Sequence, residues 1–196
     1  MARRNRVTPT GEIVATDARG TFMGNRGGCL HDEGGALVRS YRSKAWLICL
    51  LEFKGRRREL MQPGLYTELF FLDEATALTA GHRPCFECRR PDAVAFARAL
   101  TGLARPRAGD VDEALHPQRL PLGAGRPTWQ AAAEDLPDGA MVRRNGAEWL
   151  VSDRSLRRWS FEGYGPAEPV PAGTLDVLTP EPTVRALRSG YQVTVR

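Results

Sequence analysis

The sequence predicts an α+β fold. Two short helices with clear start and stop signals lie between residues 74 and 100, and segments with strand-like alternation and an Asn-Gly turn follow residue 140. The region between them, 103–139, is rich in proline, glycine and arginine. We therefore expect an N-terminal α+β domain over 1–102, a connecting segment with short helices over 103–139, and a small β-rich unit over 140–196 packed on the first domain.

Strands and turns are expected at the start of the chain. One strand is predicted around 12–15, and the apolar run 46–53 predicts a strand that is buried on both faces. Lys54-Gly55 then predicts a turn into a second strand near 57–61, so that the two strands form a hairpin.

Two helices follow from local signals. Asp73 is a natural N-cap and Gly81 a natural stop, which predicts a helix over 74–80. Pro91 suits the first turn of a second helix that runs to Leu100 and stops before Gly102.

The remaining elements are short. Asn145-Gly146 predicts a hairpin turn between two strands. The full set expected beyond residue 103 comprises helices at 110–115, 129–135 and 183–189, and strands at 140–143, 147–151, 157–161, 175–178 and 191–195.

The chain has no stretch of membrane-spanning length, and no hydrophobic segment follows its basic first residues. We expect a cytoplasmic protein without a membrane partner. Disulfides are rare in that compartment, so the four cysteines are read as metal ligands, redox groups or core thiols.

Arginine dominates the positive charge. The formal net charge is +5 and the pI is near 9.4, which favours a polyanionic partner. Only Lys44 and Lys54 are lysines, a bias that a GC-rich genome also produces, so clustering matters more than the total. Two clusters of basic residues stand out. The first contains Lys54, Arg56, Arg57 and Arg58, and the second contains Arg83, Arg89 and Arg90. We expect the second cluster and Arg26 to contact nucleic acid, DNA in the first instance; a merely solvated surface is the alternative.

Cys85 and Cys88 form a Cys-x-x-Cys pair in the segment Gly-His-Arg-Pro-Cys-Phe-Glu-Cys-Arg-Arg (81–90). Two cysteines at this spacing can bind one ion, and zinc prefers four sulfur or nitrogen ligands in a tetrahedron. A redox pair is the alternative, but such pairs usually follow a strand and begin a helix, whereas here a helix that ends at Gly81 comes first. The sequence therefore predicts a Zn²⁺ site.

Two further ligands must come from elsewhere in the chain. Cys29 and His31 share the glycine-rich loop 24–31, in which glycines allow close approach to an ion, so we expect these two residues to complete the site. Cys49 shares a strand face with apolar residues and is expected to be a core thiol. His82 is too close to Cys85 for easy chelation and is expected near the metal ligands or near phosphate.

The segment 69–91, Leu-Phe-Phe-Leu-Asp-Glu-Ala-Thr-Ala-Leu-Thr-Ala-Gly-His-Arg-Pro-Cys-Phe-Glu-Cys-Arg-Arg-Pro, resembles the second half of the N-terminal zinc domain of Ada-type DNA methylphosphotriester repair proteins. The resemblance implies an Ada-like zinc knuckle, a hairpin with short helices, in which Cys85 and Cys88 supply two of four cysteine ligands. It also implies a DNA-repair or DNA-processing setting. Members of that family carry a first cysteine pair shortly before the Phe-Phe, and 54–68 contains no cysteine, so the family's methyl-acceptor chemistry is not expected here.

Two other functions are compatible with the sequence. A nuclease-like phosphodiesterase would use His31, His82 or His116 as a base near the metal, with Asp112 one helical turn before His116 to orient it. A protein-interaction module would hold zinc for structural reasons alone. The first expectation remains a zinc protein that contacts nucleic acid through its arginine-rich knuckle.

Overall fold

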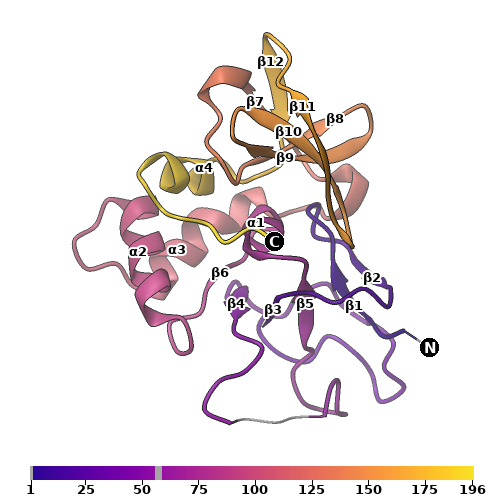
Figure 1. Ribbon diagram of the computed structural model, residues 1–196. Helices are drawn as coiled ribbons and strands as arrows, with labels where there is room; N and C mark the ends of the chain where they lie inside the picture. The colour runs from indigo at the N-terminus through magenta and orange to yellow at the C-terminus, as the bar shows by residue number, and fades with distance from the viewer. Residues whose placement is uncertain (1, 56–58) are drawn as a thin grey trace.

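The computed structural model describes residues 2–55 and 59–196 of the chain. In this part of the chain, two six-stranded sheets occupy opposite ends of the molecule, and most of the helical residues lie between them or beside them (Figure 1). The fold is therefore mixed α+β, as the sequence predicts. Arg56, Arg57, Arg58 and the start of the strand predicted near 57–61 lie outside the described residues, and 59–61 is not a strand.

The first sheet has the order β2-β1-β5-β3-β4-β6. Its strands are β1 (Arg4–Val7), β2 (Ile13–Ala15), β3 (Phe22–Asn25), β4 (Leu47–Cys49), β5 (Leu69–Phe71) and β6 (Arg83–Pro84). β4 pairs antiparallel with β3 and parallel with β6. The predicted strand 46–53 thus ends at Cys49, and Leu50 and Leu51, which follow it, are exposed. The expected hairpin of 46–53 with 57–61 is absent from the described residues, and an Ada-like knuckle is not confirmed.

Helices α1 (Glu74–Thr79) and α2 (Arg90–Thr101) flank β6 in the chain. The Asp73 carboxylate accepts a hydrogen bond from the backbone N–H of Thr76 at 2.9 Å, as expected of an N-cap. Gly81 and Gly102 adopt φ of 87° and 71°, so the two stop signals act as predicted. α3 (Ala108–Leu115) and α4 (Glu181–Arg188) pack with α2 in one group (Figure 1).

The second sheet has the order β11-β10-β9-β8-β12-β7. Its strands are β7 (Trp129–Ala132), β8 (Met141–Arg144), β9 (Ala147–Ser152), β10 (Ser155–Ser160), β11 (Gly163–Pro169) and β12 (Thr174–Val177). The turn at Asn145-Gly146 has φ of 51° and 73° and joins β8 to β9, as predicted.

Two predictions in this part were wrong. Residues 129–132 form a strand rather than a helix, because they pair along their length with β12, and only Ala133–Asp135 make a 3₁₀ turn. Residues 191–195 are not a strand; they run beside α1, where Tyr191 hydrogen-bonds to Glu74. Sheet pairing and side-chain contacts outweighed the local pattern in both cases.

One hydrophobic cluster runs through all three expected parts of the chain, from Val7 through Val111 and Leu136 to Val184. α1 joins the two sheets: it follows β5 directly, and the second sheet reaches it through Trp159 Nε1, which donates to Thr76 Oγ1 at 3.0 Å. α1 is therefore in contact with both sheets.

A search of the described residues finds no helix that combines the length and the apolar character needed to cross a bilayer.

Candidate metal centre

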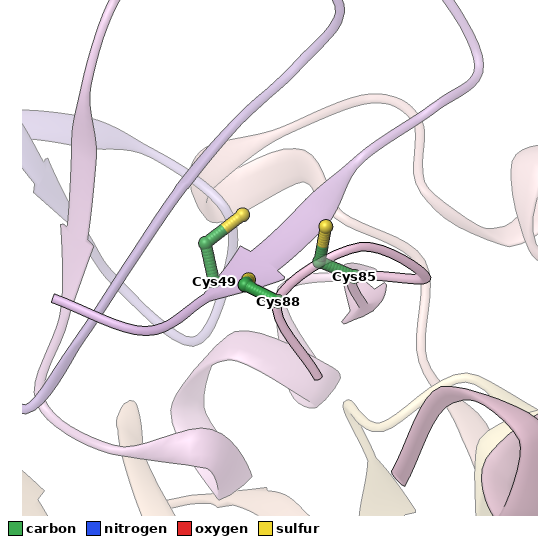
Figure 2. Close-up of side chains that lie close together, drawn as sticks. All are labelled: Cys49, Cys85 and Cys88. Carbon is green, nitrogen blue, oxygen red and sulfur yellow. The ribbon is translucent and has the colours of Figure 1, made fainter. Parts of the chain in front are cut away.

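Three cysteines meet at the end of the first sheet. The sulfur atoms of Cys49, Cys85 and Cys88 all lie within 4.8 Å of one another. Figure 2 shows that they come from two facing segments: Cys49 from the end of β4, and Cys85 and Cys88 from the turn that leads into α2. The sequence predicted the pair correctly as neighbours, and the structure adds a third thiol.

The register of β4 with β6 explains this meeting. Leu47 pairs with Arg83 and Ile48 with Pro84 in parallel, and the backbone N–H of Cys85 donates to the carbonyl of Ile48 at 2.9 Å. Because parallel strands advance in step, the residue after Ile48 arrives at the level of Cys85. Both strands end there, so Cys49 and Cys85 leave the sheet at the same edge.

Backbone and thiol hydrogen bonds polarise the three sulfurs. The backbone N–H of Glu87 donates to Cys85 Sγ at 3.4 Å. The hydrogen bond from the Cys49 thiol is the main cause that lowers the pKa of Cys85 to about 5, and it also lowers the pKa of Cys88. The same bonds raise the pKa of Cys49 far above its ordinary range. Three converging sulfurs, two of them with a lowered pKa, suit a soft divalent cation.

The three cysteines line a pocket of about 450 Å³. Most of its other lining residues are apolar or aromatic, including Leu47, Phe53, Leu60 and Phe70, and three are glutamates: Glu52, Glu68 and Glu87. Among the described residues, no arginine or lysine lines it. The described lining is thus mostly apolar with three glutamates, and the pocket borders the place where the sulfurs converge.

The two ligands expected from the glycine-rich loop are elsewhere. His31 is buried, with Nδ1 2.6 Å from Thr67 Oγ1 and Nε2 3.2 Å from the carbonyl oxygen of Gln62. Cys29 Sγ lies 3.2 Å from the carbonyl oxygen of His31. Neither residue belongs to the group of cysteines found among the described residues. Both ring nitrogens of His31 already have protein partners, and Cys49, rather than Cys29 or His31, lies beside Cys85 and Cys88.

Cys49 itself was expected to be a core thiol. It is only partly buried, and its sulfur faces the pocket rather than the apolar core. The strand face that it shares with Leu47 faces the same pocket, which is why the apolar pattern concealed it.

Three of the four arginines expected to bind phosphate are internal. Arg26, Arg83 and Arg89 are all at most 5% exposed. Arg83 makes two hydrogen bonds to the Asp112 carboxylate, at 3.0 and 2.9 Å, and Arg89 lies 2.8 Å from Glu74. Guanidinium groups buried in this way do not fit the expected contacts with the phosphates of a nucleic acid. Arg90 is the exposed member of the set.

The candidate acid–base residues do not gather at the cysteines. His82 is fully buried, and its Nε2 lies 3.2 Å from Arg26 Nε. Burial and then Arg26 lower the pKa of His82 well below its ordinary value. His116 lies edge-on to Tyr41, with 5.7 Å between ring centroids, while Asp112 is held by Arg83 and is not available to orient it. None of the three histidines belongs to the cysteine group in the described chain.

The Cys85–Cys88 pair was expected to follow a helix directly, and the structure differs in one respect. The two-residue strand β6 lies between α1 and Cys85, so the pair does follow a strand and precede a helix, as redox pairs do. The third thiol within 4.8 Å is what favours metal over a disulfide here.

With the fold and this geometry described, comparison with known proteins adds no relative: no family model, no curated protein and no solved structure matches the chain. The resemblance of 69–91 to Ada-type zinc domains stays an expectation from those residues alone.

Proposed function

We propose that the protein binds one zinc ion through Cys49, Cys85 and Cys88, and that the ion keeps its fourth coordination position open to the adjoining pocket. The observation that carries this proposal is the group of three thiols, with no fourth Cys, His, Asp or Glu ligand atom within the same distance among the described residues. Structural zinc sites are usually closed by four protein ligands, whereas reactive sites have three and leave one position for a water or substrate. Thiolate donors favour zinc over magnesium, calcium or manganese.

The pocket indicates the class of molecule that would occupy the open position. Its lining is mostly apolar, so it favours a small, largely apolar ligand. A bound zinc ion would polarise a donor atom of that ligand or of a water. We therefore favour a metal-dependent reaction on a small molecule over hydrolysis of nucleic acid, for which the three histidines are poorly placed.

Cobalt substitution tests both parts of the proposal. The wild-type protein, reconstituted with Co²⁺, should bind one equivalent and show the visible bands of a tetrahedral site together with sulfur-to-cobalt charge-transfer bands. Cys49→Ser should lose the tight site or the charge-transfer intensity of one thiolate. Cys29→Ser is the matched control and should keep the wild-type spectrum, because Cys29 lies outside the group.

Imidazole then probes the fourth position. Its addition should shift the visible bands of the Co²⁺ protein, because an open position accepts an outside ligand. A spectrum that imidazole leaves unchanged would point to a closed, purely structural zinc and would support the interaction-module alternative. Metal binding lost in Cys29→Ser but kept in Cys49→Ser would overturn the ligand set.

Contact with nucleic acid is a separate proposal, supported by the net charge of +5 and by the exposed Arg90 beside the knuckle. Affinity for duplex DNA, measured by fluorescence anisotropy, should fall steeply between low and physiological salt and should weaken in Arg90→Ala. Absence of binding at low salt would remove this proposal without touching the metal site. A DNA-repair setting and a cytoplasmic location likewise stay predictions.

A further inference from the structure

Three arginines are buried together away from the cysteines. Arg26, Arg119 and Arg126 are each at most 2% exposed. Arg26 follows β3, while Arg119 and Arg126 each follow a 3₁₀ turn, His116–Gln118 and Gly123–Gly125. Segments distant in sequence therefore bring three cationic side chains into one interior region.

The three guanidinium groups share neighbours. The Cζ atoms of Arg26 and Arg119 lie 4.2 and 4.9 Å from the centroid of the buried Trp46 ring. A Cβ atom at Gly11 would lie 3.4 Å from Arg126 Nη1 and 3.5 Å from Arg26 Nη2. Arg26 and Arg126 thus approach the same backbone position, and Arg26 and Arg119 contact the same indole.

Most donors of Arg119 and Arg126 lack an acceptor. Nε and Nη2 of Arg119, and Nε, Nη1 and Nη2 of Arg126, are buried without a hydrogen-bond partner. Arg26 is satisfied only by neutral groups, with Nη2 donating to the Gly11 carbonyl at 2.9 Å and Nε facing His82. Buried guanidinium donors without an acceptor from the protein are uncommon, because buried polar groups ordinarily have a hydrogen-bond partner.

Negative charge is also scarce. Among the described residues, the one ion pair of the group is Arg119 with Asp112 at 3.7 Å, and Asp112 is already bonded twice to Arg83; no ion pair reaches Arg26 or Arg126. Met1 and Arg56–Arg58 carry no side-chain carboxylate, so they offer no missing partner. Burial, followed by the other arginines, lowers the pKa of Arg26. An uncompensated buried cation costs a large part of the net stability of an ordinary domain.

We propose that Arg26, Arg119 and Arg126 form an internal binding site for a small inorganic oxyanion, phosphate or sulfate. Guanidinium forks match the several acceptor oxygens of such an anion, and a divalent negative charge would offset the clustered cations. Stacking on Trp46 orients Arg26 and Arg119 but supplies no acceptor for the five unpartnered nitrogens. This site is independent of the metal centre.

The test uses the full chain with two variants. Arg126→Met removes a buried guanidinium, and Arg185→Met removes one that is 56% exposed on α4 as the matched control. Thermal unfolding midpoints of each protein are measured over a range of phosphate, sulfate or chloride concentrations at equal ionic strength. In a second experiment, protein equilibrated with each salt is desalted and then denatured, and ion chromatography identifies the anion that is released.

The wild-type protein and Arg185→Met should release a stoichiometric amount of one oxyanion, and their melting temperatures should rise with it and saturate. Arg126→Met should show only the gradual, unsaturated effect of salt. It should be more stable than the wild type in chloride and less stable in the preferred oxyanion. The chromatogram distinguishes phosphate from sulfate. Wild-type protein that releases neither anion, or that responds to oxyanion as Arg126→Met does, would overturn the proposal; the release measurement stands even if the variant fails to fold.

Discussion

At the scale of single residues, the arginines that flank the cysteine pair stabilise the interior. Arg83 lies just before Cys85 and is bound twice by Asp112 of α3, at 3.0 and 2.9 Å. Arg89 lies just after Cys88 and meets Glu74 of α1 at 2.8 Å. Each buried pair connects one side of the turn that carries Cys85 and Cys88 to a different helix, so the position of the thiols depends on charges that a sequence pattern would assign to a surface.

This arrangement makes a prediction for Asp112→Asn. The substitution leaves the Arg83 guanidinium buried without its counter-charge, which typically costs about 3–5 kcal/mol of unfolding free energy. Glu113→Gln is the matched control in the same helix, because the side chains of Glu113 and its partner Lys44 are 67% and 48% exposed and solvent screens their ion pair. Urea denaturation measures both. Equal losses in the two variants would contradict the structural role of the buried pair.

At the scale of elements, local signals and tertiary pairing contributed unequally. The helices α1 and α2 and the hairpin of β8 with β9 were predicted, because N-caps, stop glycines and the Asn-Gly turn act within a few residues. β6 contains only Arg83 and Pro84, and a pattern of two residues cannot predict a strand. The strand forms because the backbone N–H groups of Arg83 and Cys85 donate hydrogen bonds to the carbonyls of Trp46 and Ile48.

The same reasoning accounts for the candidate site. The Cys-x-x-Cys spacing indicated two ligands, but the third depends on the register of β4 with β6. The sequence does not mark Cys49 as the end of a strand, because the apolar run continues through Leu50 and Leu51; the structure ends β4 there. Ends of neighbouring parallel strands meet at one edge, so a cysteine at such an end is a better ligand candidate than one in a distant loop.

At the scale of the whole molecule, residues 191–196 stabilise the first turn of α1 through hydrogen bonds. Tyr191 donates its hydroxyl to Glu74 at 2.6 Å, and the backbone N–H of Thr194 donates to the other oxygen of Glu74 at 3.0 Å. The backbone N–H of Arg196 lies 3.2 Å from Asp73, the N-cap of α1. The fully buried Glu74 also pairs with Arg89, so residues 191–196 are linked to the turn that carries Cys85 and Cys88.

Removal of 191–196 should therefore destabilise the protein as a whole. Glu74 Oε2 loses its backbone donor, at a cost of about 1–3 kcal/mol, whereas Oε1 loses Tyr191 but keeps Arg89. Thermal unfolding followed by tryptophan fluorescence should show a lower midpoint, and the truncated protein should lose Co²⁺ more readily. Gln192→Ala, which changes only an exposed side chain, is the control. Unaltered stability and metal retention after truncation would show that α1 does not need this support.

Some properties of this chain were readable without coordinates because they are set within a few residues: the mixed α+β class, the capped helices, the Asn-Gly turn and the close approach of Cys85 to Cys88. Others came into view only with the folded chain, namely the third thiol, the pocket beside it, and the burial of Arg26, Arg83, Arg89, Arg119 and Arg126. The physical reason is the sequence separation over which each interaction acts. Caps and turns depend on local hydrogen bonds, whereas strand register and burial depend on which distant segments meet. An arginine is the same letter in the sequence whether its side chain faces water or an interior carboxylate.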